Sequence, residues 1–122
     1  MAKIKIEVVS CNKQALSQSR YAEFDEMGGN IGRAEGNALV LHDQDRYISR
    51  IHAAIIYQQK QYFIRCLGSA LPIYLNDQAL NNNQEAPIHG GDTISIGDYL
   101  MQVHGEEASV SKTKVVVSCV GR

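Results

Sequence analysis

The stretch NIGRAEGNALVLHDQDRYISRIHA, residues 30–53, decides the fold of this chain and the search for its functional site. It places Arg33, and further on Ser49, Arg50 and His52, between short apolar runs. Short apolar runs that alternate with turn-forming residues are typical of β-strands joined by loops. The stretch therefore predicts that its charged and hydroxyl side chains lie in loops at the ends of strands.

The same pattern continues on both sides of this stretch. In residues 3–9 the isoleucines and Val8 alternate with charged residues, and this period of two predicts a half-buried strand. Only the polar residues 13–20 show a pattern that could be helical. Many short strands about 8–12 residues apart predict an all-β sandwich or barrel. The other strand-like runs are YAEF, NIGR, NALVL, HAAIIYQQ, QYFIRCL, IYLN, DTISIG and YLMQVHG.

Length and composition indicate one globular domain with no general affinity for polyanions. The chain has 122 residues, of which 44% are hydrophobic and 20% charged, and its formal net charge is -1. A nucleic-acid partner is therefore not expected. The amino terminus lacks a signal-peptide core, and no apolar run reaches the roughly 20 residues needed to cross a bilayer. We expect a cytoplasmic protein without membrane insertion.

The three cysteines, Cys11, Cys66 and Cys119, are far apart and form no CxxC pair. An odd number without paired spacing predicts reduced thiols rather than a disulfide framework.

Residues 105–122 differ in character from the domain that precedes them. EEASVSKT is polar and linker-like, whereas KVVVSCV is prone to form a strand. The tail is interpreted as an extra strand, a linker to another domain or a cloning remainder, and the sequence leaves these three open.

Enzymatic and metal sites find no support in the sequence. GGNIGR lacks both the G-x-G-x-x-G fingerprint and the G-K-[ST] ending of a P-loop. No G-x-S-x-G elbow is present, and no metal-ligand spacing is found among His42, His52, His89 and His104. We therefore expect no catalytic residues, no metal and no cofactor.

Anion binding fits the residues better. Gly32 permits tight backbone geometry, so that Arg33 projects from a loop on a rigid β scaffold, where binding residues are usually found. Ser49 and Arg50 precede another strand and can converge on the same anion. Arginine matches phosphate oxygens with two parallel hydrogen bonds, and a hydroxyl adds a further donor.

In their order and spacing, these motifs resemble the forkhead-associated (FHA) domain over residues 3–104, which makes residues 1–104 the expected FHA domain. The resemblance implies a β-sandwich of two twisted, mostly antiparallel sheets that binds phosphothreonine peptides and is not an enzyme. The motifs that carry it are Gly32-Arg33, Ser49-x-x-His52, YLN at 74–76 and GDTISIG at 91–97.

The resemblance also implies a role for each matching residue. Arg33 and Ser49 would contact the phosphate, and Arg50 would contact the phosphate or the peptide backbone. Gly32 and His52 would support the binding loops, and Asn76 would anchor its own turn as part of that structural support.

A narrower similarity is to the amino-terminal FHA domain of proteins associated with type VI secretion in Gram-negative bacteria. It implies secretion-apparatus components as partners and control by a threonine kinase and phosphatase. The segments that carry it are IEVVS and FDEMGGNIGRAEGNALVLHDQDRYISRIHA.

The chain departs from the family pattern in CLGSALPI, residues 66–73. Ala70 occupies the position of a Ser or Thr that often contacts the phosphate, and Leu71 replaces the Asn that holds the peptide backbone. Ser69 remains, and we expect it to cap its own loop. Two functions stay open: phosphothreonine-peptide binding with a degenerate second ligand loop, or a scaffold domain that docks an unphosphorylated partner through loops or a sheet face.

Overall fold

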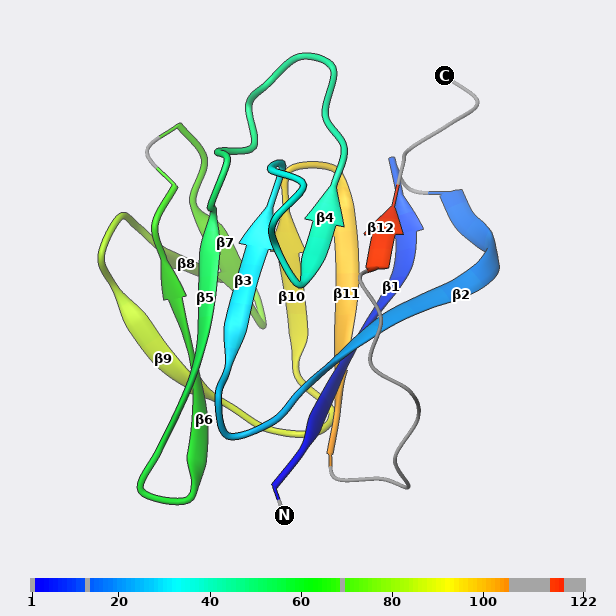
Figure 1. Cartoon of the computed structure of the whole chain (residues 1–122). Coiled ribbons are helices and arrows are strands. Elements are labelled where there is room, and N and C mark those ends of the chain that lie inside the picture. The colour runs from blue at the N-terminus through cyan, green and yellow to red at the C-terminus, as the bar shows by residue number, and fades with distance from the viewer. Residues whose placement is uncertain (1, 13, 69, 106–114, 118–122) are drawn as a thin grey trace.

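The computed structural model describes residues 2–12, 14–68, 70–105 and 115–117, which form two packed sheets and no helix (Figure 1). One sheet has the order β2-β1-β11-β10-β7-β8, and the other β12-β4-β3-β5-β6-β9. The strands are β1 Ile4–Cys11, β2 Gln14–Phe24, β3 Gly29–Gly32, β4 Leu39–Leu41, β5 Ala53–Gln58, β6 Gln61–Cys66, β7 Ile73–Leu75, β8 Gln78–Leu80, β9 Glu85–Ile88, β10 Thr93–Ile96, β11 Tyr99–His104 and β12 Val115–Val117.

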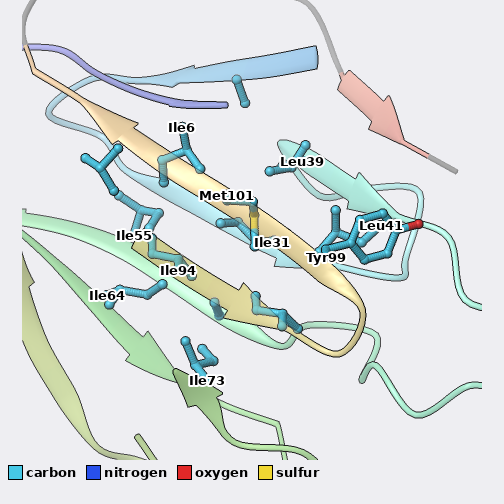
Figure 2. Packing of buried hydrophobic residues seen from close by; sticks show 14 of the residues in the cluster. Ile6, Ile31, Leu39, Leu41, Ile55, Ile64, Ile73, Ile94, Tyr99 and Met101 are labelled. Atoms are coloured by element: carbon cyan, nitrogen blue, oxygen red, sulfur yellow. The ribbon is translucent and has the colours of Figure 1, made fainter. Parts of the chain in front are cut away.

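The predicted all-β sandwich of mostly antiparallel strands is confirmed. Only the β3–β4 and β4–β12 pairs are parallel among the pairs of the described strands. The core fills the space between the sheets with aliphatic side chains from both (Figure 2). Ile6 and Met101 come from one sheet and Ile31 and Ile64 from the other, and all four are fully buried.

Strand β1 follows the predicted alternation and then changes phase. Ile4, Ile6 and Val8 are buried, and the register shifts between Val8 and Ser10 against both neighbouring strands. A β-bulge inserts one residue and so exchanges the two faces of the strand beyond it. Cys11 is therefore buried at a position that strict alternation would expose.

The helical interpretation of residues 13–20 is wrong, because β2 begins at Gln14 and pairs with β1 at both of its ends. β2 is the edge strand of its sheet. Two further edge strands, β8 and β9, were absent from the predicted set. β9 contains Pro87, which an edge strand tolerates because one side of it makes no ladder hydrogen bonds.

The expectation that the cysteines are reduced thiols holds only in part. Cys66 is a free and buried thiol, whereas Cys11 is disulfide-bonded, so the prediction of reduced thiols is wrong for Cys11. Cys119 lies outside the described residues.

The tail contributes β12, which pairs in parallel with β4 and buries Val117. The hydroxyl of Tyr99 donates to the carbonyl oxygens of His42 and Val117, at 2.7 and 3.2 Å, and so connects this strand to the β4–β5 loop. Over the described part of the chain, no helix is long and apolar enough to cross a membrane.

Candidate functional site

Three loops and one turn gather at the same end of the sandwich (Figure 1). They are the β3–β4 loop (33–38), the β4–β5 loop (42–52), the β6–β7 loop (67–72) and the β10–β11 turn (97–98). All the sequence-predicted binding residues lie in the first two. The candidate site is built from these loops.

Backbone hydrogen bonds hold Arg33 against Ser49 and Arg50. The amide of Arg33 donates to the carbonyl of Ser49, and the amide of Ala34 donates to the carbonyl of Arg50, both at 3.1 Å. Gly32 makes this approach possible, since a Cβ at that position would overlap the carbonyl oxygen of Arg50. The structure thus brings the three predicted ligand residues into adjacent backbone segments.

The side chain of Arg33 is half-buried and oriented by one hydrogen bond. Its Nε donates to the carbonyl oxygen of Ile48 at 2.9 Å. Within the described part of the chain, no carboxylate forms an ion pair with Arg33 or Arg50. Ser49 is half-buried and Arg50 exposed. Two arginines and a serine therefore lie on adjacent backbone segments, and neither arginine forms an ion pair with a described carboxylate.

His52 supports the site through hydrogen bonds between its ring and the backbone of two loops. Its ring is fully buried, its Nδ1 accepts a hydrogen bond from the amide of Ser49, and its Nε2 lies 2.9 Å from the carbonyl oxygen of Leu71. These partners require a neutral ring with the proton on Nε2. Burial lowers the pKa of His52, and the hydrogen bond to Leu71 opposes that effect only in part. His52 thus ties the β4–β5 loop to the β6–β7 loop as an uncharged side chain.

Gly68 allows this contact between the loops, because its backbone packs directly against the imidazole of His52. A Cβ at residue 68 would overlap the ring. The amide of Leu67 also donates to the carbonyl of His52 at 2.8 Å. The side-chain amide of Asn82 adds hydrogen bonds to the carbonyls of Leu67 and Gly68, at 3.2 and 3.3 Å.

Two further supporting residues were not identified from the sequence. Asn37 is buried and donates to the carbonyl of Arg50 at 2.7 Å. Asp43 accepts from the amides of Asp45 and Ile48, at 3.2 and 2.9 Å, and so shapes the turn that carries Ile48 to Arg33. A local signal was available for Asp43 alone, because an Asp at the start of a loop commonly bonds to nearby backbone groups.

The third loop differs from the first two. Ala70 is exposed, while Leu71 and Pro72 are half-buried. Neither the Ala70 nor the Leu71 side chain can donate a hydrogen bond to a phosphate or a peptide. Ser69, which was expected to cap this loop, lies outside the described residues.

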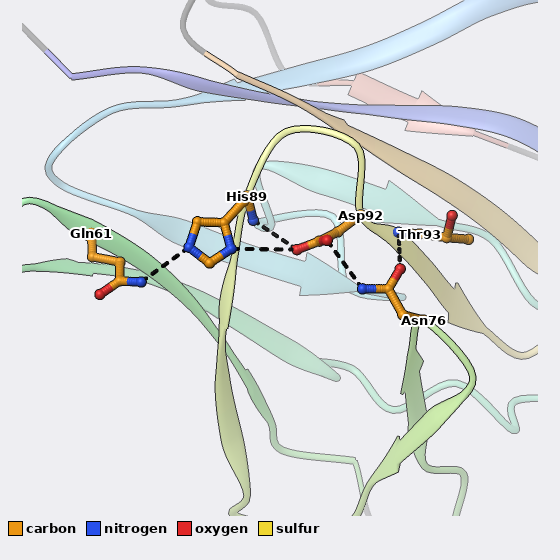
Figure 3. A network of polar contacts seen from close by, with 5 residues as sticks. All are labelled: Gln61, Asn76, His89, Asp92 and Thr93. Atoms are coloured by element: carbon orange, nitrogen blue, oxygen red, sulfur yellow. Dashed lines mark hydrogen bonds and ion pairs between the residues drawn. The ribbon is translucent and has the colours of Figure 1, made fainter.

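Asn76 follows β7, at the end of the sandwich opposite the binding loops. Figure 3 shows its polar contacts. Its side chain accepts from the amide of Thr93 at 2.9 Å and donates to Asp92 at 3.0 Å. Asp92 in turn accepts from the amide of His89 at 2.7 Å, and Gln61 contacts the His89 ring at 3.1 Å. Asn76 therefore anchors its own turn to the β9–β10 turn. Its side-chain hydrogen bonds go to Asp92 and Thr93 and not to the binding loops.

Histidines elsewhere do not assemble a metal site. His42 lies 3.3 Å from Glu35, and His104 lies 2.8 Å from Glu7. In the described ranges no group of three or more His, Cys, Asp or Glu side chains is arranged to hold a metal ion.

Solved structures with the same fold include three of particular interest. The FhaA FHA domain, solved with the intracellular domain of Rv3910, is 21% identical, with a TM-score of 0.68 over 83% of this chain and 99% of that one. Mycobacterium tuberculosis EmbR, in complex with a low-affinity phosphopeptide, is 20% identical, with a TM-score of 0.71 over 91% of this chain and 26% of that one. The MEK1 FHA domain, in complex with a HOP1 phosphothreonine peptide, is 15% identical, with a TM-score of 0.65 over 88% of this chain and 100% of that one.

No curated protein matches the chain in sequence. The family model described as the FHA domain matches residues 29–97, more than half of the chain, and the FHA domain is a protein-interaction module. The match contains all of the loops that hold Arg33, Ser49, Arg50 and His52. The chain belongs to the FHA domain family.

Proposed function

We propose that this domain binds a phosphothreonine peptide through Arg33, Ser49 and Arg50. The observation that carries the proposal is the guanidinium of Arg33, which the Ile48 carbonyl orients beside Ser49 and Arg50 while no described carboxylate neutralises it. A phosphate brings about 1.5 to 2 negative charges at neutral pH. Charge-assisted hydrogen bonds contribute about 1.5–3 kcal/mol each, so Arg33 is the dominant contact.

Binding to a generic phosphothreonine peptide is expected to be weak. Ala70 and Leu71 remove up to two polar contacts, and a lost neutral hydrogen bond costs about 0.5–1.5 kcal/mol, or about 1–3 when its partner stays unsatisfied. At 1.4 kcal/mol for each factor of ten, affinity falls by roughly 10- to 1000-fold relative to an intact site.

The proposed setting is a cytoplasmic regulator of bacterial type VI secretion, in which a threonine kinase and phosphatase control the phosphate on the partner. Its support is the similarity of residues 6–10 and 24–53 to the FHA domains of that group. Within this proposal, residues 1–104 form the binding domain and residues 105–122 a tail that supplies β12 to the sheet.

The test is a titration of one peptide with and without phosphate on its threonine. We expect a phosphate preference that Arg33→Ala abolishes and Ser49→Ala weakens less. Arg20→Gln, an exposed arginine on β2, removes the same charge elsewhere and should leave the preference intact. High salt should weaken binding, though less than for an open surface patch. An Arg33→Ala variant that keeps its full phosphate preference contradicts the assigned site.

A second function is favoured by the surface around the same loops. Tyr47 and Ile51 are 61% and 42% exposed in the β4–β5 loop, and Leu71 places a third apolar side chain in the β6–β7 loop. These side chains suit a phosphate-independent scaffold that docks a folded partner by a wider contact. Equal affinity for the two forms of the peptide, together with lost partner binding in Tyr47→Ala, would support the scaffold over the phosphate reader.

A further inference from the structure

A cavity of about 360 Å³ lies between the β4–β5 loop and the β10–β11 turn. Its apolar lining residues include Tyr47, Ile48 and Leu71, and its acidic lining residues are Asp43, Asp45 and Asp98. The volume is within the range of pockets that accept a ligand group. The lining combines an apolar wall with three negative charges.

The cavity is next to the candidate phosphate site, because two of its lining residues also hold that site together. Ile48 lines the cavity with its side chain and holds Arg33 with its carbonyl oxygen. Leu71 also lines the cavity, and its carbonyl oxygen receives the hydrogen bond from His52. A peptide with its phosphate at Arg33 would therefore have this cavity next to its phosphate site.

The charges at the cavity are opposite to those at the phosphate site. Asp43 is fixed by the amides of Asp45 and Ile48. Asp45 and Asp98 are exposed, and no ion pair within the described part of the chain neutralises either. His42 also borders the cavity, with Glu35 at 3.3 Å from its ring. A neutral or acidic occupant would leave the three carboxylates without a counter-charge.

We propose that this cavity receives a lysine or arginine side chain from the same partner peptide. Such a side chain has an aliphatic stem, which packs on Ile48, Leu71 and Tyr47, and a cationic head, which meets the aspartates. This proposal gives Leu71 a role in selectivity. It offers an apolar contact surface to one kind of side chain, in place of a polar contact to the backbone of any peptide. The proposal rests on the proposed function, since one peptide supplies both the phosphate and the cation.

The experiment is a factorial titration of peptides with and without phosphate on the threonine. In each series lysine, norleucine or glutamate is placed in turn at every position flanking the threonine. Norleucine keeps the aliphatic stem and removes the charge. We expect lysine at one position to bind roughly two- to fivefold more tightly than norleucine, and glutamate more weakly than both, as for a largely exposed ion pair.

Asp45→Asn combined with Asp98→Asn should abolish this lysine preference and leave the phosphate preference in place. Asp77→Asn is the control, because it removes one carboxylate charge in the β7–β8 turn, at the opposite end of the sandwich. It is matched to Asp45→Asn and to Asp98→Asn when each is made alone. Its φ of 70° is one that asparagine also adopts readily. Amide chemical shifts of Gly97 and Asp98 report cavity occupancy even in the weak unphosphorylated series.

The two proposals fail separately. Phosphate preference without any lysine preference overturns the cavity proposal alone. Lysine preference that the aspartate variants abolish, without phosphate preference, overturns the proposed function alone. Lysine preference that survives both aspartate substitutions also overturns the cavity proposal, since the charge would then be read elsewhere.

Discussion

The two ends of the sandwich use their polar side chains in opposite ways. At the end that holds Asn76, the side chains of Asn76, Asp92, His89 and Gln61 satisfy one another or the backbone nearby. At the other end, Asn37, Asp43 and His52 satisfy the backbone of the loops, while Arg33 and Arg50 have no described carboxylate partner.

This difference separates a structural network from a binding site. Networks that are fully satisfied stabilise and specify a fold, and they leave no group for a ligand. At the binding end the support and the ligand groups are different residues: neutral or backbone-bonded side chains hold the loops, and the cations remain available. Substitutions at the two ends should therefore have separable effects on stability and on binding.

The largest expected effect follows from His52→Ala. The change removes the acceptor for the Ser49 amide, the donor for the Leu71 carbonyl and a fully buried ring. Unsatisfied buried groups and a cavity together should cost about 2–4 kcal/mol in the free energy of unfolding. Urea denaturation measures this cost, and His89→Ala, whose ring is largely exposed, is the comparison that should lose less stability. A loss below about 0.5 kcal/mol would show that His52 does not brace the loops.

Asn76→Ala should have a smaller effect, confined to stability. The residue bonds to Thr93 and Asp92 and has a φ of 51°, in the left-handed region. Loss of these bonds and the strain on alanine should cost about 1–2 kcal/mol. Asn76→Gly removes the same bonds without the strain and should recover part of the loss. Peptide affinity should stay unchanged in both variants, and a change in affinity would mean that the two ends are coupled.

Substitutions in the β6–β7 loop should strengthen peptide binding rather than weaken it. Ala70→Thr with Leu71→Asn adds polar groups to the binding end, and we expect generic phosphothreonine peptides to bind about tenfold more tightly, which is about 1.4 kcal/mol. The gain depends on a compatible loop shape at Pro72, which proton NMR of the folded variant can check. Tight binding by the unaltered domain, or no gain in a correctly folded repaired variant, would contradict the role assigned to this loop.

Most of the fold could be predicted from sequence because burial imposes a period of two. Ile4, Ile6 and Val8 show this period, and all three are buried. Edge strands lack the signal, since a strand with one neighbour needs little apolar alternation. This accounts for β9, with its Pro87, and for the polar start of β2. The burial of Cys11 depends on a β-bulge that the local sequence pattern does not predict.

The positions of the site residues could be predicted in part. Arg33, Ser49 and His52 carry motif spacing, and the structure places them in neighbouring loop segments. Asp43 bonds within its own loop, but the support from Asn37 and the cavity lined by Leu71 depend on contacts between loops that are separate in sequence. Such contacts arise only once the sheets bring the loops together, so a single sequence carries little information about them.

The smallest predicted effect is a pH dependence of stability that arises from His52. Its pKa is lowered in the folded protein, so the unfolded chain binds a proton at a higher pH than the folded one. The contribution of the neutral ring is therefore complete above the ordinary histidine pKa of about 6.5 and is lost progressively as the pH falls below it. One titrating group changes the free energy of unfolding by at most about 1.4 kcal/mol per pH unit. Urea denaturation of the parent chain and of His52→Asn at several pH values isolates this contribution, because the other histidines are common to both proteins. The stability difference between them should shrink on acidification, and ring-nitrogen NMR should show Nε2 protonated and Nδ1 unprotonated at neutral pH. A stability difference that grows as the pH falls would require a folded-state pKa above the ordinary value, and with it a charged ring between Ser49 and Leu71.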